Sequence, residues 1–374
     1  MKKTTKLTVK FRGEEVGALS LTPDNRLCVF EYAKEWIVDV FSISPIELPL
    51  RPGSFIAKAN PFCGNFGIFE DSLPDGYGRY MLHKALRRKG INDSDLSSLD
   101  RLAIVGESGM GALTYSPKRE LEREELVTDF DRLQQLALEV LKDQQDTDAG
   151  LLLYNSGNSG GARPKAVFSD EAGHWIVKFR HIYDPADIGV QEYSYNDAAR
   201  KCGIVLPDFR LVNERYFASR RFDIDADGCR LHTATAGALL GLSLREPFMD
   251  YHNLLALTGY ITQRSEDVEQ MYRRMLFNYL TDNKDDHCKN FSFYVVKDPQ
   301  VGKWCWRLAP AYALTLCSEG YNGEPASSVN GSAHPVLEDF VAVGTKTRMT
   351  RKRCLDIIDE VRSGCGELIR YHII

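Results

Sequence analysis

Two side chains separated by four residues predict a site for phosphoryl transfer. In the segment NKDDHCKNFSF (283–293), Asp285 and Asn290 have this spacing, and His287 and Lys289 lie between them. An aspartate can orient an attacking hydroxyl group and accept its proton, while an asparagine oxygen can help to hold a magnesium ion that bridges phosphates. A loop of this length allows both side chains to face one phosphoryl group, as in the H-R-D-x-x-x-x-N loop of protein kinases.

The same segment admits two other interpretations. It also fits a polar helix end and a turn before the strand-like run FSFYVV (291–296). A zinc site made of Asp285, Asp286, His287 and Cys288 has ligands that lie too close together in sequence, and no distant His/Cys pair is evident. Spacing alone therefore leaves the kinase-type loop and the plain turn open.

A kinase-type loop requires a phosphate-binding loop and a lysine earlier in the chain. The glycine-rich run SGNSGGARPK (156–165) would let backbone N–H groups approach phosphates. Lys178 lies on the apolar strand-like run HWIVKFR (174–180), where a lysine needs a partner, and Glu192 on the following helix is the candidate. A hairpin-edge lysine and a solvated glutamate are the alternatives. The rival glycine-rich segment GESGMG (106–111) lacks a following strand lysine and is interpreted as a turn.

A metal-binding carboxylate is expected after the catalytic loop, like the aspartate of the D-F-G motif. The corresponding region is WRLAPAYALTLC (306–317), with a strand-like start and a proline-containing turn. The position where an acid is expected holds Ala313, and the nearest acid is Glu319.

Residue patterns predict the elements that must position these groups. Period-two alternation predicts strands, and an apolar stripe at helical spacing predicts helices. The charged run 118–126 is a predicted linker, and Thr128 and Thr350 are predicted helix caps. The predicted strands are 5–12, 16–21, 27–32, 111–117, 166–170, 174–180 and a pair within 209–223. The segment 72–90 is predicted to be a turn that leads into a basic helix ending at Gly90, and the other predicted helices are 129–143, 191–202, 268–280 and one that follows Thr350.

Bulk composition indicates a globular protein of two or three units. The chain has 374 residues, of which 43% are hydrophobic and 26% charged, and its net charge of −5 argues against wholesale wrapping of nucleic acid. No apolar run suggests a signal peptide or a membrane span. Nine scattered cysteines without a CxxC pair are typical of free thiols in a reducing cytoplasm, which is the expected location.

Several segments together resemble the HipA family of bacterial toxin serine/threonine kinases. The resemblance covers nearly the whole chain, and the combination of segments is much more specific than any one of them. The segments are FEYAKEW (30–36), SPIELPL (44–50), FEDSLPDGYGR (69–79), SGGARPKA (159–166), RRFDI (220–224), RLH (230–232), DDHCKNFSF (285–293) and LAPAYAL (308–314).

The resemblance implies an α+β fold with a protein-kinase-like body of two lobes. The expected units are an N-terminal β-rich HipA-like subdomain over 1–118, an ATP-binding lobe with the glycine-rich loop over 119–228, and a mostly helical catalytic lobe over 229–374. The implied ligands are ATP and Mg²⁺, and the implied reaction is phosphorylation of a protein serine or threonine.

The resemblance also assigns roles to particular positions. Asp285 matches the catalytic aspartate, with His287 close to the phosphates and Lys289 beside Asn290, which matches the metal-binding asparagine. Residues 158–165 match the phosphate loop, and Lys178, with Glu192 as its expected partner, matches the lysine that pairs with ATP. The expected nucleotide-binding residues of that loop are Ser159, Gly160, Gly161, Ala162, Arg163 and Lys165.

Family members can phosphorylate a serine of their own phosphate loop, which ejects the loop and silences the kinase. Ser156 and Ser159 are the candidates here, and Asn158 stands near the position where some members have that serine. The implied partners are a helix-turn-helix antitoxin, HipB-like, and a protein substrate of the aminoacyl-tRNA synthetase class. The antitoxin would sequester the toxin and repress the operon, so DNA would be contacted only through it, and no membrane is involved.

The main departure from the family is at one residue. The family pattern L-x-P-x-Y-D ends here in Ala313, so a metal ion would lose a carboxylate ligand. The chain is therefore interpreted as an impaired kinase, and a catalytically dead pseudokinase that binds nucleotide and antitoxin is the alternative. A kinase of small molecules or lipids is a third class, but no lipid-binding amphipathic helix is evident.

Two later segments have plainer interpretations. SEGYNGEPASSVNG (318–331) falls where an activation or substrate-docking loop is expected, and its Gly, Ser and Asn content suits a loop. The basic run KTRMTRKR (346–353) is interpreted as a solvated helix start.

Overall fold

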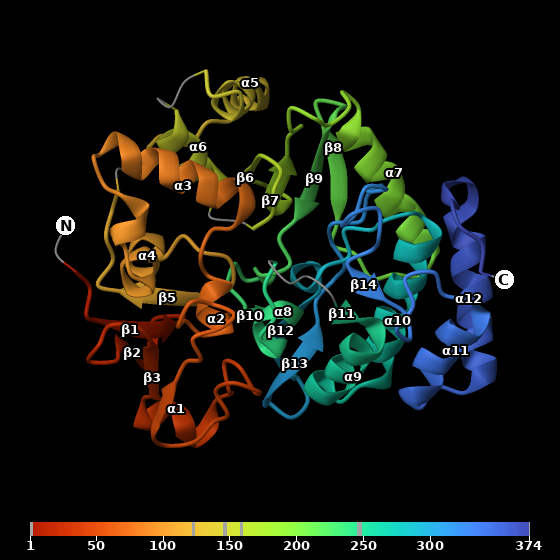
Figure 1. Ribbon diagram of the computed structural model, residues 1–374, viewed down its shortest axis with the longest axis horizontal. Coiled ribbons are helices and arrows are strands. Elements are labelled where there is room, and N and C mark those ends of the chain that lie inside the picture. The colour runs from red at the N-terminus through yellow and green to blue at the C-terminus, as the bar shows by residue number, and fades with distance from the viewer. Residues whose placement is uncertain (1–2, 122–123, 145–147, 158–159, 245–248, 374) are drawn as a thin grey trace.

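The computed structural model describes residues 3–121, 124–144, 148–157, 160–244 and 249–373 (Figure 1). The predicted mixture of helices and sheets is present, and three successive regions of the chain form a single body. The division of the chain at 118/119 and 228/229 stays a prediction.

The N-terminal region contains a five-stranded antiparallel sheet in the order β4-β3-β2-β1-β5. Every second side chain of β1 is buried, as its alternating sequence predicts. The strands are β1 (Lys6–Phe11), β2 (Glu14–Leu21), β3 (Cys28–Tyr32), β4 (Ser54–Ile56) and β5 (Leu113–Ser116), and the helices are α1 (Lys34–Asp39), α2 (Gly67–Glu70), α3 (Gly76–Arg88), η1 (Asp93–Asp95) and α4 (Ser98–Val105).

The middle region contains a four-stranded antiparallel sheet in the order β6-β7-β9-β8. The predicted hairpin at 171–173 joins β6 to β7. The elements are α5 (Phe130–Leu141), α6 (Ala149–Ser156), β6 (Lys165–Asp170), β7 (Gly173–Lys178), α7 (Ile188–Lys201), β8 (Phe209–Val212) and β9 (Tyr216–Arg220).

One predicted helix cap is wrong. Asp129, not Thr128, caps α5, and its carboxylate accepts a hydrogen bond of 3.0 Å from the Arg132 N–H. Both residue types favour the cap position, so composition could not distinguish two neighbouring candidates. Thr350 does cap the last long helix, as predicted.

The C-terminal region is mostly helical, as predicted, but it also contains two small sheets. A three-stranded antiparallel sheet has the order β10-β12-β13, and β11 pairs with β14 in parallel. The elements are β10 (Thr233–Thr235), α8 (Ala236–Leu240), β11 (Met249–Asp250), α9 (Tyr251–Thr262), α10 (Ser265–Leu280), η2 (Cys288–Asn290), β12 (Ser292–Lys297), β13 (Trp304–Leu308), β14 (Ser327–Ser328), α11 (Leu337–Lys346), α12 (Arg351–Cys365) and η3 (Gly366–Leu368).

The apolar core crosses the borders between these regions. One cluster of buried residues joins the N-terminal sheet to the helices of the C-terminal region, where Trp304 packs edge-on against Phe11 with ring centroids 5.6 Å apart. A second cluster beneath the middle sheet includes Tyr77 and Met81 of α3. Figure 1 shows α3 running beside α6, so the N-terminal region contributes to both cores.

Two further features concern the whole chain. All nine cysteines are free thiols, as their spacing predicts. None of the helices in the described ranges has the length and apolarity needed to cross a membrane.

Candidate functional site

The predicted catalytic loop follows the end of α10 and leads into β12. Asp286 anchors this loop, because its buried carboxylate accepts hydrogen bonds from the Tyr251 hydroxyl at 2.8 Å and from the Ser327 N–H at 3.1 Å. Burial raises the pKa of Asp286 to about 7, although those two donors act in the opposite direction. Asp285 next to it has a side chain that is 45% exposed, so the anchored loop presents Asp285 to the outside.

Asp285, His287 and Asn290 lie together, as the spacing predicts. The Asn290 amide nitrogen donates to the Asp285 carbonyl at 2.6 Å, which leaves the amide oxygen as the atom that could bind a metal ion. His287 Nε2 is 3.7 Å from the Asp285 carboxylate, and His287 Nδ1 accepts from the Lys289 N–H at 3.2 Å. Burial lowers the pKa of His287 despite the nearby carboxylate, so the imidazole is neutral near pH 7.

Position 313 faces the catalytic loop. Asp285, Asn290 and Ala313 line one cavity of about 10 Å³, together with Asn283, whose amide donates to the Ala313 carbonyl at 3.3 Å. Glu319 is exposed and is not among the residues that line this cavity. An acid at position 313 would therefore lie near Asp285 and Asn290, and the methyl group of Ala313 provides no ligand in its place.

The expected pairing of Lys178 with Glu192 is present. Lys178 at the end of β7 donates to the Glu192 carboxylate on α7, and Glu192 is buried. One turn further along α7, Asn196 donates to the Leu314 carbonyl at 3.2 Å. The helix that carries Glu192 therefore also contacts the segment of Ala313.

The described part of the phosphate loop approaches the same region. Gly161 has a φ of +101°, which favours glycine, and Lys165 donates to the Gly160 carbonyl. Burial, and then the charge of Lys178 across the β6–β7 pair, lowers the pKa of Lys165 to about 8. An anion bound between the two lysines would relieve this repulsion.

Arg163 and Ser156 have different surroundings. Arg163 makes a two-pronged ion pair with Asp184, with N–O distances of 2.8 and 3.0 Å. Ser156 is buried at the end of α6, and its hydroxyl donates to the Leu153 carbonyl at 2.7 Å. Ser159 and the neighbouring Asn158 lie outside the described residues.

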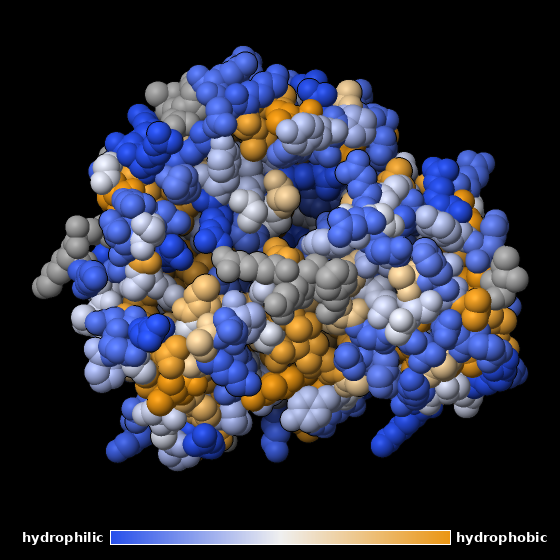
Figure 2. Space-filling view, viewed as in Figure 1, coloured by the Kyte–Doolittle hydropathy of each residue, from blue (hydrophilic) through white to orange (hydrophobic). Residues whose placement is uncertain are grey.

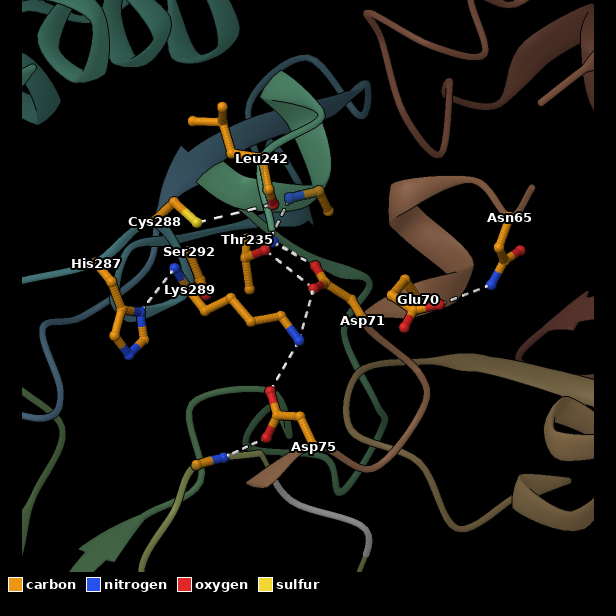
Figure 3. A network of polar contacts seen from close by, with 12 residues as sticks. Asn65, Glu70, Asp71, Asp75, Thr235, Leu242, His287, Cys288, Lys289 and Ser292 are labelled. Atoms are coloured by element: carbon orange, nitrogen blue, oxygen red, sulfur yellow. Dashed lines mark hydrogen bonds and ion pairs between the residues drawn. The ribbon is translucent and has the colours of Figure 1, made fainter. Parts of the chain in front are cut away.

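Sequence reasoning missed two carboxylates at the site. Figure 3 shows the Lys289 ammonium between Asp71 and Asp75 of the N-terminal region, at N–O distances of 3.9 and 2.8 Å. Asp71 also accepts from the Thr235 N–H at 2.7 Å. Both acids lie in the segment FEDSLPDGYGR (69–79), which the resemblance had marked without assigning it a role.

One face of the molecule is hollowed. Figure 2 shows a hollow with mostly hydrophilic residues in the upper middle of that face, over the strands of the middle sheet. In the described ranges, no three side chains of the His, Cys, Asp and Glu types are grouped so that they could hold a metal ion. A cation at this site would thus depend on Asn290, Asp285 and the oxygens of a bound ligand.

Comparison with known proteins identifies the family. The profile of the HipA-like C-terminal domain matches residues 157–368, and that of the HipA N-terminal domain matches residues 7–116. A Sinorhizobium fredii protein (strain NBRC 101917 / NGR234) named "Putative kinase Y4dM" is 24% identical over 393 residues, which cover 96% of this chain and 90% of that protein.

One solved structure shares the fold over nearly the whole chain. The HipA structure of Shewanella oneidensis MR-1, from a toxin–antitoxin complex with HipB and operator DNA, superposes with a TM-score of 0.71 at 17% identity and covers 97% of this chain and 90% of that one. The proinflammatory kinase CtkA of Helicobacter pylori covers 55% of this chain and 90% of its own, with a TM-score of 0.36 at 12% identity. The match to the Shewanella structure confirms the two-lobed, kinase-like α+β fold, and the two domain profiles show that the chain belongs to the HipA family.

Proposed function

We propose that this protein is a HipA-type toxin kinase that transfers the γ-phosphate of ATP to a serine or threonine of a protein. The main support is that position 313, which lies more than twenty residues further along the chain, lines one cavity with Asp285 and Asn290. The Lys178–Glu192 pair belongs to the same arrangement, because α7 contacts the segment next to Ala313. These are the parts that a kinase needs to orient a hydroxyl group and to hold phosphates.

The residues present fit ATP and, in part, Mg²⁺. The Lys178 and Lys165 ammonium groups and the backbone of Gly160 would hold the phosphates, and the Asn290 amide oxygen would bind the metal ion. The metal ion, when bound, would neutralise charge on the transferred phosphoryl group.

The chain itself supplies the groups that act on the acceptor. Asp285 is exposed on an anchored loop, so its carboxylate can orient the acceptor hydroxyl and take its proton. His287 is held beside it as a neutral imidazole. The arrangement therefore orients a protein hydroxyl toward the phosphates held by the two lysines.

Ala313 makes the proposed kinase a weak one. Loss of a metal-binding carboxylate where charge develops would cost roughly two to four orders of magnitude in rate. The same residue supports the second candidate, a pseudokinase that binds nucleotide and antitoxin without catalysis. The two candidates differ in one observable, which is phosphate transfer.

The proposed partners follow from the family. The Shewanella HipA structure is a complex with HipB and operator DNA, which supports a HipB-like helix-turn-helix antitoxin for this chain, with DNA contacted through that antitoxin. An aminoacyl-tRNA synthetase is the proposed substrate, and its phosphorylation would stall translation and arrest growth. The proposed location is the cytoplasm, where both partners would be found.

Transfer of radiolabelled phosphate from ATP–Mg²⁺ tests the proposal. The chain, Ala313→Asp and Ala313→Asp/Asp285→Asn are each mixed with a cell lysate. We expect weak labelling by the chain, labelling roughly two to four orders of magnitude stronger by Ala313→Asp, and none by the double variant. If Ala313→Asp is silent while ATP still binds, the kinase assignment is wrong and the pseudokinase replaces it.

A further inference from the structure

We propose that Asp75 is a positioning residue that holds the phosphate loop against the catalytic loop. The N-terminal region would thereby contribute a residue to the kinase site. The inference deepens the proposed function and rests on it for the roles of the two loops. The contacts of Asp75 carry the argument, and they can be tested without ATP.

Asp75 connects two segments that come from different lobes. One carboxylate oxygen accepts a hydrogen bond from the Gly161 N–H of the phosphate loop. The other accepts from the Lys289 ammonium of the catalytic loop at 2.8 Å. Figure 3 shows the Asp75 carboxylate facing the Lys289 ammonium. A single side chain of the N-terminal region therefore bridges both loops.

The position of Asp75 in its own helix supports this role. Asp75 is the N-cap residue of α3, and aspartate at this position usually accepts from an N–H group of its own helix. Its side chain makes no such bond. The carboxylate binds Gly161 and Lys289 instead. The side chain of Asp75 therefore does not serve to stabilise the start of α3.

The backbone around Asp75 holds the phosphate loop at the same place. The Tyr77 N–H donates to the Gly161 carbonyl at 3.0 Å. A Cβ atom at Gly76, where φ is +44°, would lie 2.6 Å from that carbonyl oxygen. A Cβ atom at Gly160 would lie 3.0 Å from the Asp75 carboxylate. Two glycines thus permit a close approach between the start of α3 and the phosphate loop.

Of the two acids beside Lys289, Asp75 keeps its negative charge to lower pH. Burial raises the pKa of Asp71 to about 6, more than Lys289 and Thr235 lower it. For Asp75, burial acts in the same direction but is outweighed by Lys289 and Gly161, so its pKa is lowered. Burial alone would lower the pKa of Lys289, yet the two carboxylates raise it. Lys289 therefore remains charged inside the protein because of these two acids.

Asp71 provides a matched control because it shares only one of the two contacts. It lies near Lys289 and binds Thr235, but within the described residues none of its hydrogen bonds or ion pairs reaches the phosphate loop. Removing Asp71 weakens the pairing of Lys289 and releases Thr235, but leaves the bond between Asp75 and Gly161 in place. Removing Asp75 weakens that pairing and also releases the Gly161 N–H.

The experiment compares Asp75→Ala, Asp71→Ala and the unchanged full-length chain. Amide hydrogen exchange is measured without nucleotide over residues 160–166 and 285–291, and the Kd for a fluorescent ATP analogue with Mg²⁺ is measured separately. We expect Asp75→Ala to speed exchange of 160–166 by about tenfold or more and to weaken nucleotide binding by about tenfold, as for one charge-assisted hydrogen bond. Asp71→Ala should leave exchange of 160–166 unchanged.

The outcomes separate the inference from the proposed function. If Asp75→Ala leaves exchange of 160–166 unchanged, or if Asp71→Ala speeds it equally, Asp75 does not position the loop. If the unchanged chain binds no nucleotide, the proposed function fails, while the exchange data still decide the role of Asp75. Should Asp75→Ala not fold, Asp75→Asn takes its place and is expected to weaken nucleotide binding while Asp71→Asn does not.

Discussion

Position 313 illustrates how one residue can decide activity without deciding the fold. Ala313 has a φ of +56°, a left-handed conformation that Asp and Asn adopt more readily than alanine. The segment is held by Asn283 and Asn196, which bind backbone carbonyls and not the side chain of residue 313. An aspartate is therefore compatible with this backbone, and its main effect would be on metal binding.

Ala313→Asp should make thermal stability dependent on Mg²⁺. Without the metal ion, the added carboxylate lies near Asp285 and does not raise the unfolding midpoint. With Mg²⁺ and a non-hydrolysable ATP analogue, we expect the midpoint of the variant to rise by about 2–5 °C more than that of the unchanged chain. Differential scanning fluorimetry measures this, and equal shifts in both proteins would contradict a metal site at position 313.

Lys178→Met should destabilise the folded protein because it leaves the Glu192 carboxylate buried without its ion-pair partner. The Glu192 side chain is 3% exposed and that of Lys178 25% exposed, so the loss is smaller than for a fully buried pair. We expect the free energy of unfolding to fall by about 1–3 kcal/mol in urea titrations. Lys201→Met, which breaks an exposed pair with Asp197 on the same helix, is the control and should cost at most about 0.5 kcal/mol.

At the scale of elements, short contacts between regions matter as much as the regular helices and strands. His232, just before β10, is buried, and its Nε2 atom lies 2.8 Å from the Ile43 carbonyl of the N-terminal region. Its ring also packs against Phe41 and Trp306. Burial lowers its pKa to about 4, although the contact with Ile43 acts the other way. A neutral histidine thus forms part of the contact between the N-terminal and C-terminal regions.

Because of His232, the free energy of unfolding should be lower in mild acid than at neutral pH. Between pH 6.5 and about 4, the unfolded state binds a proton at His232 that the folded state excludes, so the free energy of unfolding falls as pH falls through this range. We expect a contribution of about 2 kcal/mol between pH 7.5 and pH 5.

The buried acids Asp71 and Asp286 act with the opposite sign, because their raised pKa values favour proton uptake by the folded state. The His232 contribution is therefore isolated as the difference between the unchanged chain and His232→Gln, each titrated with urea at both pH values. Equal pH dependence in the two proteins would contradict the prediction.

At the scale of the whole molecule, the N-terminal region packs against both of the other regions. Its sheet shares one buried cluster with the C-terminal helices, and α3 contributes to the cluster beneath the middle sheet. Asp71 and Asp75 reach from the same region to the catalytic and phosphate loops. Packing and polar contacts therefore join the three regions into one unit.

The chain should accordingly unfold in one cooperative transition. Scanning calorimetry is expected to give a single peak with a ratio of calorimetric to van't Hoff enthalpy of about one. Phe41→Ala, which removes a buried ring next to Trp304, should lower the free energy of unfolding by about 3–5 kcal/mol and move the whole peak. A second peak that moves alone would show that the N-terminal region unfolds independently.

The sequence by itself determined most of the local structure and the parts of the site that lie close in the chain. Strands such as β1 and helices such as α10 follow from hydrophobic periodicity, because one face of each must be buried. Asp285 and Asn290 were found from their spacing, since a short loop keeps them together whatever surrounds it. Ala313 was recognised as a departure because the family pattern has an aspartate at this position.

Only the tertiary structure decided which distant groups meet. Asp71 and Asp75 are about two hundred residues from Lys289, and nothing in local sequence indicates that they enclose it. The choice of Asp129 over Thr128 as a cap and the burial of Ser156 also depended on three-dimensional surroundings. The physical reason is that side-chain partners and burial are properties of packing, and packing joins segments whose separation in the chain carries no signal of their contact.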